Sequence, residues 1–332
     1  MVGDPGFRFR ADAGWARRPP GDAYAWGDVV GIQCDSMDRV HVFNRGRHAM
    51  QVYSSDGTFL ESWGEGRFDH AHGLTIGPDD CLYATDDYEH TVRKFSPDGR
   101  LLLTLGTPGQ RSDTGATTVD YRQVRRGAPP FNLPTNVALG LEGEIYVSDG
   151  YGNARVHKFS PEGRLIRSWG EPGPAPGQFN LPHGIAVDRR GVVYVADREN
   201  SRLQLFTPDG EFLEEWGDLA RPCQVRFDRQ GNLLIAELGY RCAHWPGNPL
   251  PPANAPGGRI TLMSPERQVL SRWGGGLNPT APGDFFAPHD ICCDSRGDIY
   301  LGEVVHSAGG KRGEVAADCH CLQKFTRLID TP

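Results

Sequence analysis

The strongest constraint on the fold of this chain is a pattern that recurs along nearly all of its 332 residues. The clearest copy spans residues 181–210, LPHGIAVDRRGVVYVADRENSRLQLFTPDG, and the run FLEEWG follows it. Apolar and polar residues alternate with a period of two within each run, and Gly, Asp and Pro separate the runs. Such alternation is typical of short antiparallel strands joined by tight turns. Each copy therefore predicts a four-stranded sheet.

Six copies can be aligned. The other five begin at Gly31, His72, Thr135, Cys223 and His289. A spacing of about 40 to 50 residues is the repeat length of a propeller blade. A blade cannot bury both of its faces alone, so the copies must stack on one another. We predict an all-β fold, a six-bladed β-propeller. It forms one domain over residues 1–332, with blades starting near residues 28, 70, 131, 179, 220 and 285.

The two ends of the chain complement each other. Residues 6–16, GFRFRADAGWA, precede the first copy and resemble the outer-strand run FLESWG. The last copy stops after LQKFTRLID and has no such run. We expect the N-terminal segment 1–27 to supply the outer strand of the last blade and to close the ring. Closure removes exposed sheet edges that would otherwise promote aggregation.

Composition indicates the compartment and excludes some partners. The chain has 43 Gly, 26 Pro and a net charge of −7, and no run of 18 apolar residues occurs. A negative protein has no overall attraction for nucleic acid or an anionic membrane. The N-terminus lacks an apolar signal core, so we expect a cytoplasmic protein without membrane or nucleic-acid partners. Among the 8 cysteines, those in expected strands show no disulfide spacing and predict free thiols. They are Cys34, Cys81, Cys292 and Cys293.

Three long insertions interrupt the repeats, at residues 107–130, 240–258 and 307–320. Loops of this length in a compact domain are usually functional or disordered. In an up-and-down blade, the loop that enters the first strand and the loop between the second and third strands lie on one face. All three insertions open onto that face, so they are expected to shape any pocket there. Their sequences show no motif that identifies a substrate, and nothing in the chain indicates an oligomeric state.

One residue of each copy lies at the entrance to the innermost strand. These residues are Val30, His72, Thr135, His183, Cys223 and His289. A single histidine at a strand start is ordinarily a solvated or hydrogen-bonded residue. Histidines at alternate copies, drawn from only 11 in the chain, instead favour three imidazoles that converge on a metal. Three neutral imidazoles with a fourth position open are typical of catalytic zinc, although iron and manganese also suit them.

Several motifs resemble those of the peptidyl-α-hydroxyglycine α-amidating lyases, which are six-bladed propellers with NHL-type repeats. They are PHGIAVD, VSDGYGNARVHKFSPEG, SWGEPGPAPGQFNLPHG, VADRENSRLQLF and APHDI. The resemblance covers residues 28–217 and 283–305, while the fifth blade matches only in pattern. It implies that His72, His183 and His289 hold zinc, as the alternating positions also indicate.

The resemblance also assigns two catalytic residues. Arg45 in FNRGR matches an arginine motif of the family, and Tyr151 in SDGY matches its catalytic tyrosine. A guanidinium suits a substrate carboxylate, and a nearby cation favours the ionised form of a tyrosine. The plain alternatives are an arginine that caps a turn and a tyrosine that packs under a loop. The motif matches favour the catalytic roles, with Tyr151 as base and Arg45 as carboxylate holder.

A structural calcium ion is a further implication of the resemblance. The family binds it through backbone oxygens and one aspartate, which correspond to Ile32, Leu74 and Asp290. Asp290 precedes an apolar strand, where an uncompensated carboxylate would be costly. Calcium or an arginine partner would remove that cost, and the sequence does not choose between them.

The departures from the family concern the pocket. Ala287 replaces a methionine near the third histidine, and Gly152 replaces a disulfide cysteine after the motif tyrosine. The family's substrates come from a copper monooxygenase domain, which these 332 residues do not contain. We therefore expect a lyase that cleaves the C–N bond of a small, carboxylate-bearing α-hydroxyglycine or carbinolamide-type acid and releases glyoxylate and an amide.

Other interpretations stay open. One is a metal-dependent hydrolase like gluconolactonase, and another is a noncatalytic NHL propeller that acts as a binding scaffold. Asp197, Arg198 and Glu199 resemble a turn network that fastens a blade, and Cys223 is expected to be a buried thiol. A second metal cluster across the last insertion is a weaker candidate, because its ligands lack the usual paired spacing. Its members would be Glu303, His306, Cys319, His320 and Cys321.

Overall fold

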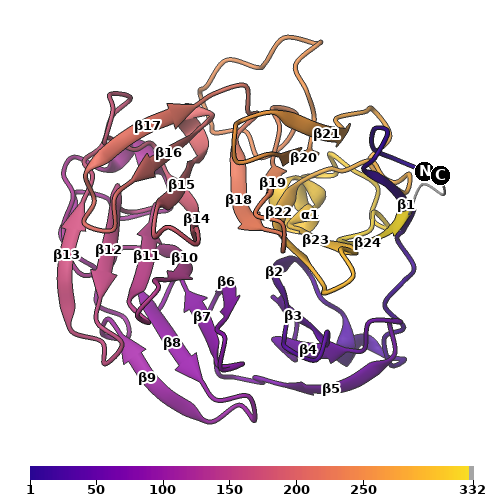
Figure 1. Cartoon of the computed structure of the whole chain (residues 1–332), viewed down its shortest axis with the longest axis horizontal. Coiled ribbons are helices and arrows are strands. Elements are labelled where there is room, and N and C mark those ends of the chain that lie inside the picture. The colour runs from indigo at the N-terminus through magenta and orange to yellow at the C-terminus, as the bar shows by residue number, and fades with distance from the viewer. Residues whose placement is uncertain (329–332) are drawn as a thin grey trace. The chain divides into compact units, whose positions relative to one another are not determined.

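The structure is a computed structural model that describes residues 1–328. It contains six four-stranded sheets, and the strands of each are neighbours in chain order apart from β1 (Figure 1). The all-β, six-bladed β-propeller predicted from the repeat is thereby confirmed. The chain divides into two compact units. The first unit is Met1–Glu65 together with the chain from Arg226 onward, and the second is Gly66–Val225.

The first unit holds blades one and six and most of blade five, whose first strand crosses the division. Blade one consists of β2 (Val29–Cys34), β3 (Val40–Asn44), β4 (Met50–Tyr53) and β5 (Phe59–Trp63). Blade five consists of β18 (Pro222–Phe227), β19 (Leu233–Glu237), β20 (Arg259–Met263) and β21 (Val269–Gly274). Blade six consists of β22 (Pro288–Cys293), β23 (Ile299–Glu303), β24 (Leu322–Leu328) and β1 (Arg8–Asp12). Short helices are η1 (Asp22–Tyr24), α1 (Val305–Ala308) and η4 (Gly310–Arg312).

The N-terminal strand completes blade six. β1 pairs antiparallel with β24, from Arg8 opposite Leu328 to Asp12 opposite Lys324. In Figure 1 the indigo strand β1 lies beside the yellow strand β24. Phe9 of β1 is 1% exposed and packs on the Trp273 ring, with the ring centroids 5.2 Å apart. The predicted closure is confirmed, and burial of an aromatic side chain stabilises it.

The second unit holds blades two, three and four. Blade two consists of β6 (Ala71–Ile76), β7 (Leu82–Asp86), β8 (Thr91–Phe95) and β9 (Leu101–Leu105). Blade three consists of β10 (Pro134–Leu139), β11 (Ile145–Asp149), β12 (Arg155–Phe159) and β13 (Leu165–Trp169). Blade four consists of β14 (Pro182–Val187), β15 (Val193–Asp197), β16 (Arg202–Phe206) and β17 (Phe212–Trp216). Short helices are η2 (Tyr121–Gln123) and η3 (Arg198–Asn200).

Burial falls across each blade from the inner strands to the outer strand. Every residue of β11 and of β15 is buried, whereas most residues of β13 and β17 are exposed. The second strands are covered on both faces, because a cluster that includes Tyr146, Ile185 and Val195 fills the space between blades three and four. The outer strands keep a solvated face, which explains their charged residues.

The cysteines and the helices bear on two further expectations. Cys34, Cys81, Cys292 and Cys293 are free thiols, as predicted, and the other four cysteines in the described residues are free as well. Cys34 Sγ lies 3.7 Å from Cys292 Sγ. Over residues 1–328, no helix is long and apolar enough to cross a bilayer.

Candidate functional site

The three strand-entrance histidines lie in β-bulges. In the pairing of β6 with β7, Ala71 lies opposite Asp86 and Gly73 opposite Thr85, so His72 has no partner in the ladder. The same interruption falls between Pro182 and Ile185, around His183. An extra residue in one strand bends it and re-aims its side chain. The bulges therefore turn these imidazoles out of the regular sheet positions.

Each of the three histidines has one ring nitrogen bound to a backbone carbonyl. The Nδ1 atom lies 2.8 Å from Thr135 O in His72, 2.9 Å from Cys223 O in His183 and 2.8 Å from Val30 O in His289. A carbonyl oxygen only accepts, so each Nδ1 carries the proton and the ring is in the Nδ1–H tautomer. Each Nε2 then presents a lone pair. A backbone acceptor of this kind is typical behind a metal-ligating histidine.

The glycine after a histidine allows this contact in two blades. A Cβ added to Gly73 would lie 2.3 Å from Thr135 O, and one added to Gly184 would lie 2.5 Å from Cys223 O. These are the carbonyls that accept from His72 and His183. A larger residue at position 73 or 184 would push these two carbonyls away, so glycine is required after His72 and His183, whereas His289 makes the equivalent contact with Asp290 after it.

His72 and His183 come together in the second unit. Their ring centroids are 4.9 Å apart, and their ligand nitrogens lie within 4.8 Å of each other. Both side chains are 1% exposed. Two buried, neutral imidazoles at this spacing can share one metal ion.

His289 belongs to the first unit, where Asp290 follows it. Asp290 Oδ2 accepts from Ile32 N over 3.0 Å, and Oδ1 lies 3.8 Å from Nε of Arg226. Arg226 therefore supplies the arginine partner that was one of the two expected ways to compensate this carboxylate. Leu74 belongs to the second unit, and calcium binding by Ile32, Leu74 and Asp290 stays a prediction.

Tyr151 lies beside the histidine pair. Its hydroxyl is 3.4 Å from His183 Nε2, and its ring centroid is 5.4 Å from that of His72. The side chain is half-buried in the loop after β11. The hydroxyl therefore faces the ligand nitrogen of a candidate metal-binding residue. This geometry favours the catalytic role over that of a tyrosine that only packs under a loop.

A buried charge network lies behind Tyr151. Arg198 Nη1 donates to the Tyr151 hydroxyl over 3.0 Å, and its guanidinium carbon is 5.2 Å from the Tyr151 ring centroid. Glu199 Oε1 accepts from Arg198 Nε at 2.9 Å and from Arg221 Nη2 at 2.8 Å. Burial raises the pKa of Glu199, but the two guanidinium charges outweigh it and lower the pKa overall. Two cations and one anion leave a net positive charge beside the phenol.

The guanidinium of Arg45, in the first unit, is hydrogen-bonded to Asp28, the residue that directly precedes blade one. Its Nη1 donates to Asp28 Oδ2 and to Ser307 Oγ, each over 3.2 Å. Asp28 Oδ1 also accepts from the backbone nitrogens of His306 and Ser307, at the start of the last insertion. The guanidinium is thus oriented by a carboxylate, and its role toward a substrate stays a prediction.

The insertion at 107–130 is fastened to the Tyr151 loop. Thr114 Oγ1 donates to Gly152 O over 2.5 Å, and Asn132 Nδ2 donates to Thr114 Oγ1 over 3.0 Å. Gly152 N donates to Asn132 O over 3.1 Å. A Cβ at position 152 would lie 2.3 Å from Asn132 Oδ1, so this close approach requires glycine. These buried bonds hold the backbone next to Tyr151.

Arg198 is a functional candidate that the sequence does not predict, because the pattern of the turn after β15 indicates a purely structural role. Asp197 fits that interpretation, since its carboxylate binds Asn180 N, Asn200 and Arg202. Arg198 does not, because it contacts Tyr151. The missed signal is positional. Arg45 directly follows β3 and Arg198 directly follows β15, so the two arginines occupy equivalent places in their blades.

The weaker metal cluster in blade six is not assembled. Glu303 Oε2 accepts from Phe286 N and Ala287 N, while Oε1 lies 3.3 Å from His320 Nδ1. Burial raises the pKa of the Cys319 and Cys321 thiols to about 12, so both are protonated at neutral pH. Over residues 1–328, none of these five residues belongs to a group of three or more His, Cys, Asp or Glu side chains that could hold a metal ion. Cys223 is a fully buried thiol, as predicted.

Comparison with known proteins agrees with the repeat. Residues 179–206 match the NHL repeat. The chain is 35% identical over 247 residues to NHL repeat-containing protein 3 of Mus musculus, covering 69% of this chain and 67% of that protein. The chain belongs to the NHL-repeat family.

Other known proteins resemble this chain in sequence or in fold. The NHL-repeat chain is 31% identical over 268 residues to peptidyl-alpha-hydroxyglycine alpha-amidating lyase 1 of Drosophila melanogaster, covering 73% of this chain and 44% of the lyase. It thus spans less than half of the lyase's length. The crystal structure of virginiamycin B lyase from Staphylococcus aureus aligns with a TM-score of 0.58 at 16% identity, covering 97% of this chain and 100% of that one. That likeness supports the fold alone.

Proposed function

We propose that this NHL-repeat protein is a metal-dependent lyase that cleaves the C–N bond of a small α-hydroxyglycine or carbinolamide-type acid. The observation that carries the proposal is the contact between Tyr151 and His183, in which a hydroxyl lies 3.4 Å from the ligand nitrogen of one of a pair of buried imidazoles. Relatives that are named as amidating lyases support the same class of reaction.

The proposed metal ligands are the Nε2 atoms of His72, His183 and His289. The donor set fits a transition metal, because each ring keeps its proton on Nδ1 and directs it to a carbonyl. We propose zinc as the bound metal, although three imidazoles also bind iron or manganese. A metal bound there would act as a Lewis acid toward the hydroxyl group of the substrate.

The residues of the chain have separate roles in this reaction. Tyr151 accepts the proton of the substrate hydroxyl, and Arg198 stabilises the phenolate from which it acts. The C–N bond breaks as the C–O bond becomes a carbonyl, and the proton passes to the departing amide nitrogen. The products are glyoxylate and an amide, so atoms and charge balance without another reactant.

Arg45 is the proposed holder of the substrate carboxylate. Its guanidinium is already oriented by Asp28 and Ser307, which restricts its rotamers before a substrate arrives. A planar fork binds a carboxylate through two parallel hydrogen bonds. The free thiols fit a reducing compartment, and we extend the proposal to a cytoplasmic enzyme.

The main alternative is a metal-dependent hydrolase that resembles gluconolactonase. Such an enzyme would bind its metal through carboxylates, whereas the paired groups here are imidazoles. A noncatalytic scaffold would not need a tyrosine hydroxyl directed at a histidine nitrogen. The hydrolase and the scaffold therefore rank behind the lyase.

The test is glyoxylate release from N-acetyl-α-hydroxyglycine by protein loaded in turn with zinc, iron(II) and manganese(II). We expect release well above the spontaneous rate with at least one metal, and none with chelated protein. A panel of sugar lactones serves as the control for the hydrolase. Lactone hydrolysis without glyoxylate release would replace the lyase proposal with the hydrolase, and neither activity with any metal would leave the scaffold.

A further inference from the structure

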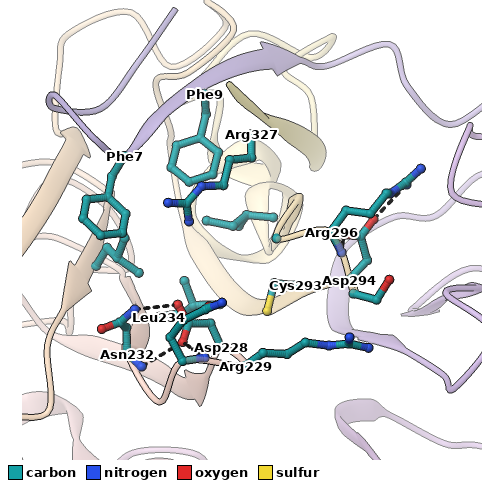
Figure 2. Close-up of a pocket in the computed structure, with 15 residues that line it drawn as sticks. Phe7, Phe9, Asp228, Arg229, Asn232, Leu234, Cys293, Asp294, Arg296 and Arg327 are labelled. Atoms are coloured by element: carbon teal, nitrogen blue, oxygen red, sulfur yellow. Dashed lines mark hydrogen bonds and ion pairs between the residues drawn. The ribbon is translucent and has the colours of Figure 1, made fainter. Parts of the chain in front are cut away.

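A second candidate site lies in the first unit, at the end of β22 that is farther from His289. A cavity of about 270 Å³ lies there. Figure 2 draws the residues that line it. Its rim is formed by the turn at 228–232 of blade five and the turn at 294–297 of blade six, and Phe7 and Phe9 of the N-terminal segment cover it. The ring-closing strand therefore helps to build the cavity. Its volume is just below the range of about 300 to 1,000 Å³ that is usual for small-molecule sites.

Arg327 supplies the central positive charge. Its guanidinium carbon lies 4.9 Å from the ring centroid of Phe7 and 6.0 Å from that of Phe9, and Figure 2 shows it beside both rings. Nη2 donates to Gly6 O over 3.2 Å. Within residues 1–328 the guanidinium forms no ion pair with a carboxylate; the only contact to Asp298 is through the backbone nitrogen. Stacking fixes the plane of the guanidinium and leaves its charge for a ligand.

The acidic residues of the cavity do not neutralise this charge. The Asp228 carboxylate stabilises its own turn, where it accepts hydrogen bonds from Gln230 N, Asn232 N and Asn232 Nδ2. Asp294 accepts from Asp298 N, from the Tyr300 hydroxyl and from both the backbone and the side chain of Arg296. All four carboxylate oxygens thus have protein donors. Three arginines, Arg229, Arg296 and Arg327, line the cavity against these two aspartates, so the net charge of the lining favours an anion.

One wall of the cavity is apolar, while Gln230, Asn232 and Ser295 add neutral polar groups to its lining. Leu234, Leu262 and Ile299 form the wall between blades five and six, and Phe7 covers it. Cys293 adds a thiol, whose pKa burial raises to about 12, so the sulfur is uncharged at neutral pH. An anion with an apolar part would use both the Arg327 guanidinium and this apolar wall, against which a fully hydrated ion would lose water.

We propose that this cavity binds a small monocarboxylate with a flat apolar body, such as an aromatic acid, with the carboxylate on Arg327 and the ring against Phe7. A planar guanidinium pairs with a carboxylate through two parallel hydrogen bonds. The apolar body is held by the wall of blades five and six. This site is separate from the histidine site and does not depend on the lyase proposal.

The test is calorimetric titration of the whole chain, freed of metal by chelation, with benzoate. Chelation removes carboxylate binding to a metal at the histidines. We expect one saturable site, with benzamide weaker by at least about tenfold because it lacks the charge. Arg327→Gln is expected to weaken benzoate by at least about tenfold, and Phe7→Ala by a few-fold. Arg10→Gln is the matched control, since Arg10 is exposed and does not line the cavity, and it should change the affinity less than about twofold.

Benzamide tests the charge requirement in the parent protein, so the experiment does not depend on whether any variant folds. Equal binding of benzoate and benzamide would overturn the proposal. Sulfate that binds as tightly as benzoate would show a simple anion site and would contradict the apolar requirement. Benzoate affinity that is unchanged in Arg327→Gln, or lost in a His72→Ala, His183→Ala variant, would place the ligand elsewhere. The absence of benzoate binding to the parent would also reject the site.

Discussion

The guanidinium of Arg198 donates a hydrogen bond to the hydroxyl of Tyr151 over 3.0 Å, and the same hydroxyl lies 3.4 Å from His183 Nε2. A phenol in this place has a fixed cation on one side and a candidate metal ligand on the other. The cation favours the phenolate, and the metal side is where a substrate hydroxyl would bind. The pair Arg198 and Tyr151 therefore connects the buried charge network to the proposed chemistry.

Replacing Tyr151 tests its role as the base. Tyr151→Phe keeps the ring that packs against the histidines and removes only the hydroxyl. We expect glyoxylate release to fall by about 10²-fold or more, since loss of a general base costs about 10²- to 10⁴-fold. Metal content should be unchanged. Turnover equal to that of the parent would remove Tyr151 from the mechanism.

Thr114 should act on Tyr151 through the backbone of its loop. Thr114→Val removes a buried donor to Gly152 O and an acceptor for Asn132, at a cost of about 1 to 3 kcal/mol in the free energy of unfolding. A loosened Tyr151 should lower kcat more than it raises KM. Urea denaturation and glyoxylate kinetics measure the two effects. Thr114→Ser should restore both, and the exposed Thr117→Val should change neither. A Thr114→Val enzyme with the parent's kcat would contradict this role.

Glu199 holds two arginines in a buried network. Its side chain is 8% exposed, and those of Arg198 and Arg221 are 5% and 7% exposed. Glu199→Gln leaves two like charges without their shared anion, so we expect a loss of about 3 to 5 kcal/mol in the free energy of unfolding. Glu215→Gln is the control, because Glu215 is 47% exposed in its pair with Arg202 and should cost less than about 1 kcal/mol. Equal losses in the two variants would show that the network is not energetically coupled.

His320 should make stability depend on pH. Burial lowers its pKa, but the Glu303 carboxylate 3.3 Å away outweighs burial and raises the pKa above the usual 6.5. A raised pKa stabilises the fold fully below about pH 6.5, and this contribution is lost as pH rises through the folded-state pKa.

The measurement is the free energy of unfolding in urea between pH 6 and pH 9. It should fall more steeply with pH in the parent than in His320→Gln. The control is His306→Gln, in which the replaced side chain is exposed, and it should follow the parent. Identical slopes in the parent and His320→Gln would reject the pair as a source of pH dependence.

The fold is predictable from the sequence because every blade carries its own copy of the same strand and turn pattern. The strand pattern, the outer strand from residues 6–16 and the alternate histidines all follow from aligning copies of one unit. The β-bulge at each histidine was not predicted, since a bulge depends on how two strands pair. The Gly after His72 and His183 was visible, but its reason, the carbonyl of the next blade, appears only in three dimensions.

The contacts between blades were the part that one sequence could not supply. Arg226 lies in the first strand of blade five and Asp290 in the first strand of blade six. No rule of sequence spacing links the two residues, so only the fold identifies Arg226 as the partner of the Asp290 carboxylate. The sequence predicts only a turn network at Arg198, because its neighbours Asp197 and Asn200 do form one. In the repeat, Arg198 and Arg45 occupy equivalent positions, each directly after the second strand of its blade.

The central claim is that the three histidines bind one metal ion. The most direct measurement is elemental analysis of protein purified without chelator and supplied with zinc, beside a His72→Ala, His183→Ala, His289→Ala variant. We predict about one transition metal per chain in the parent, as a single three-imidazole site requires, and almost none in the variant. A parent without metal, or a variant that retains the parent's metal content, would contradict the account.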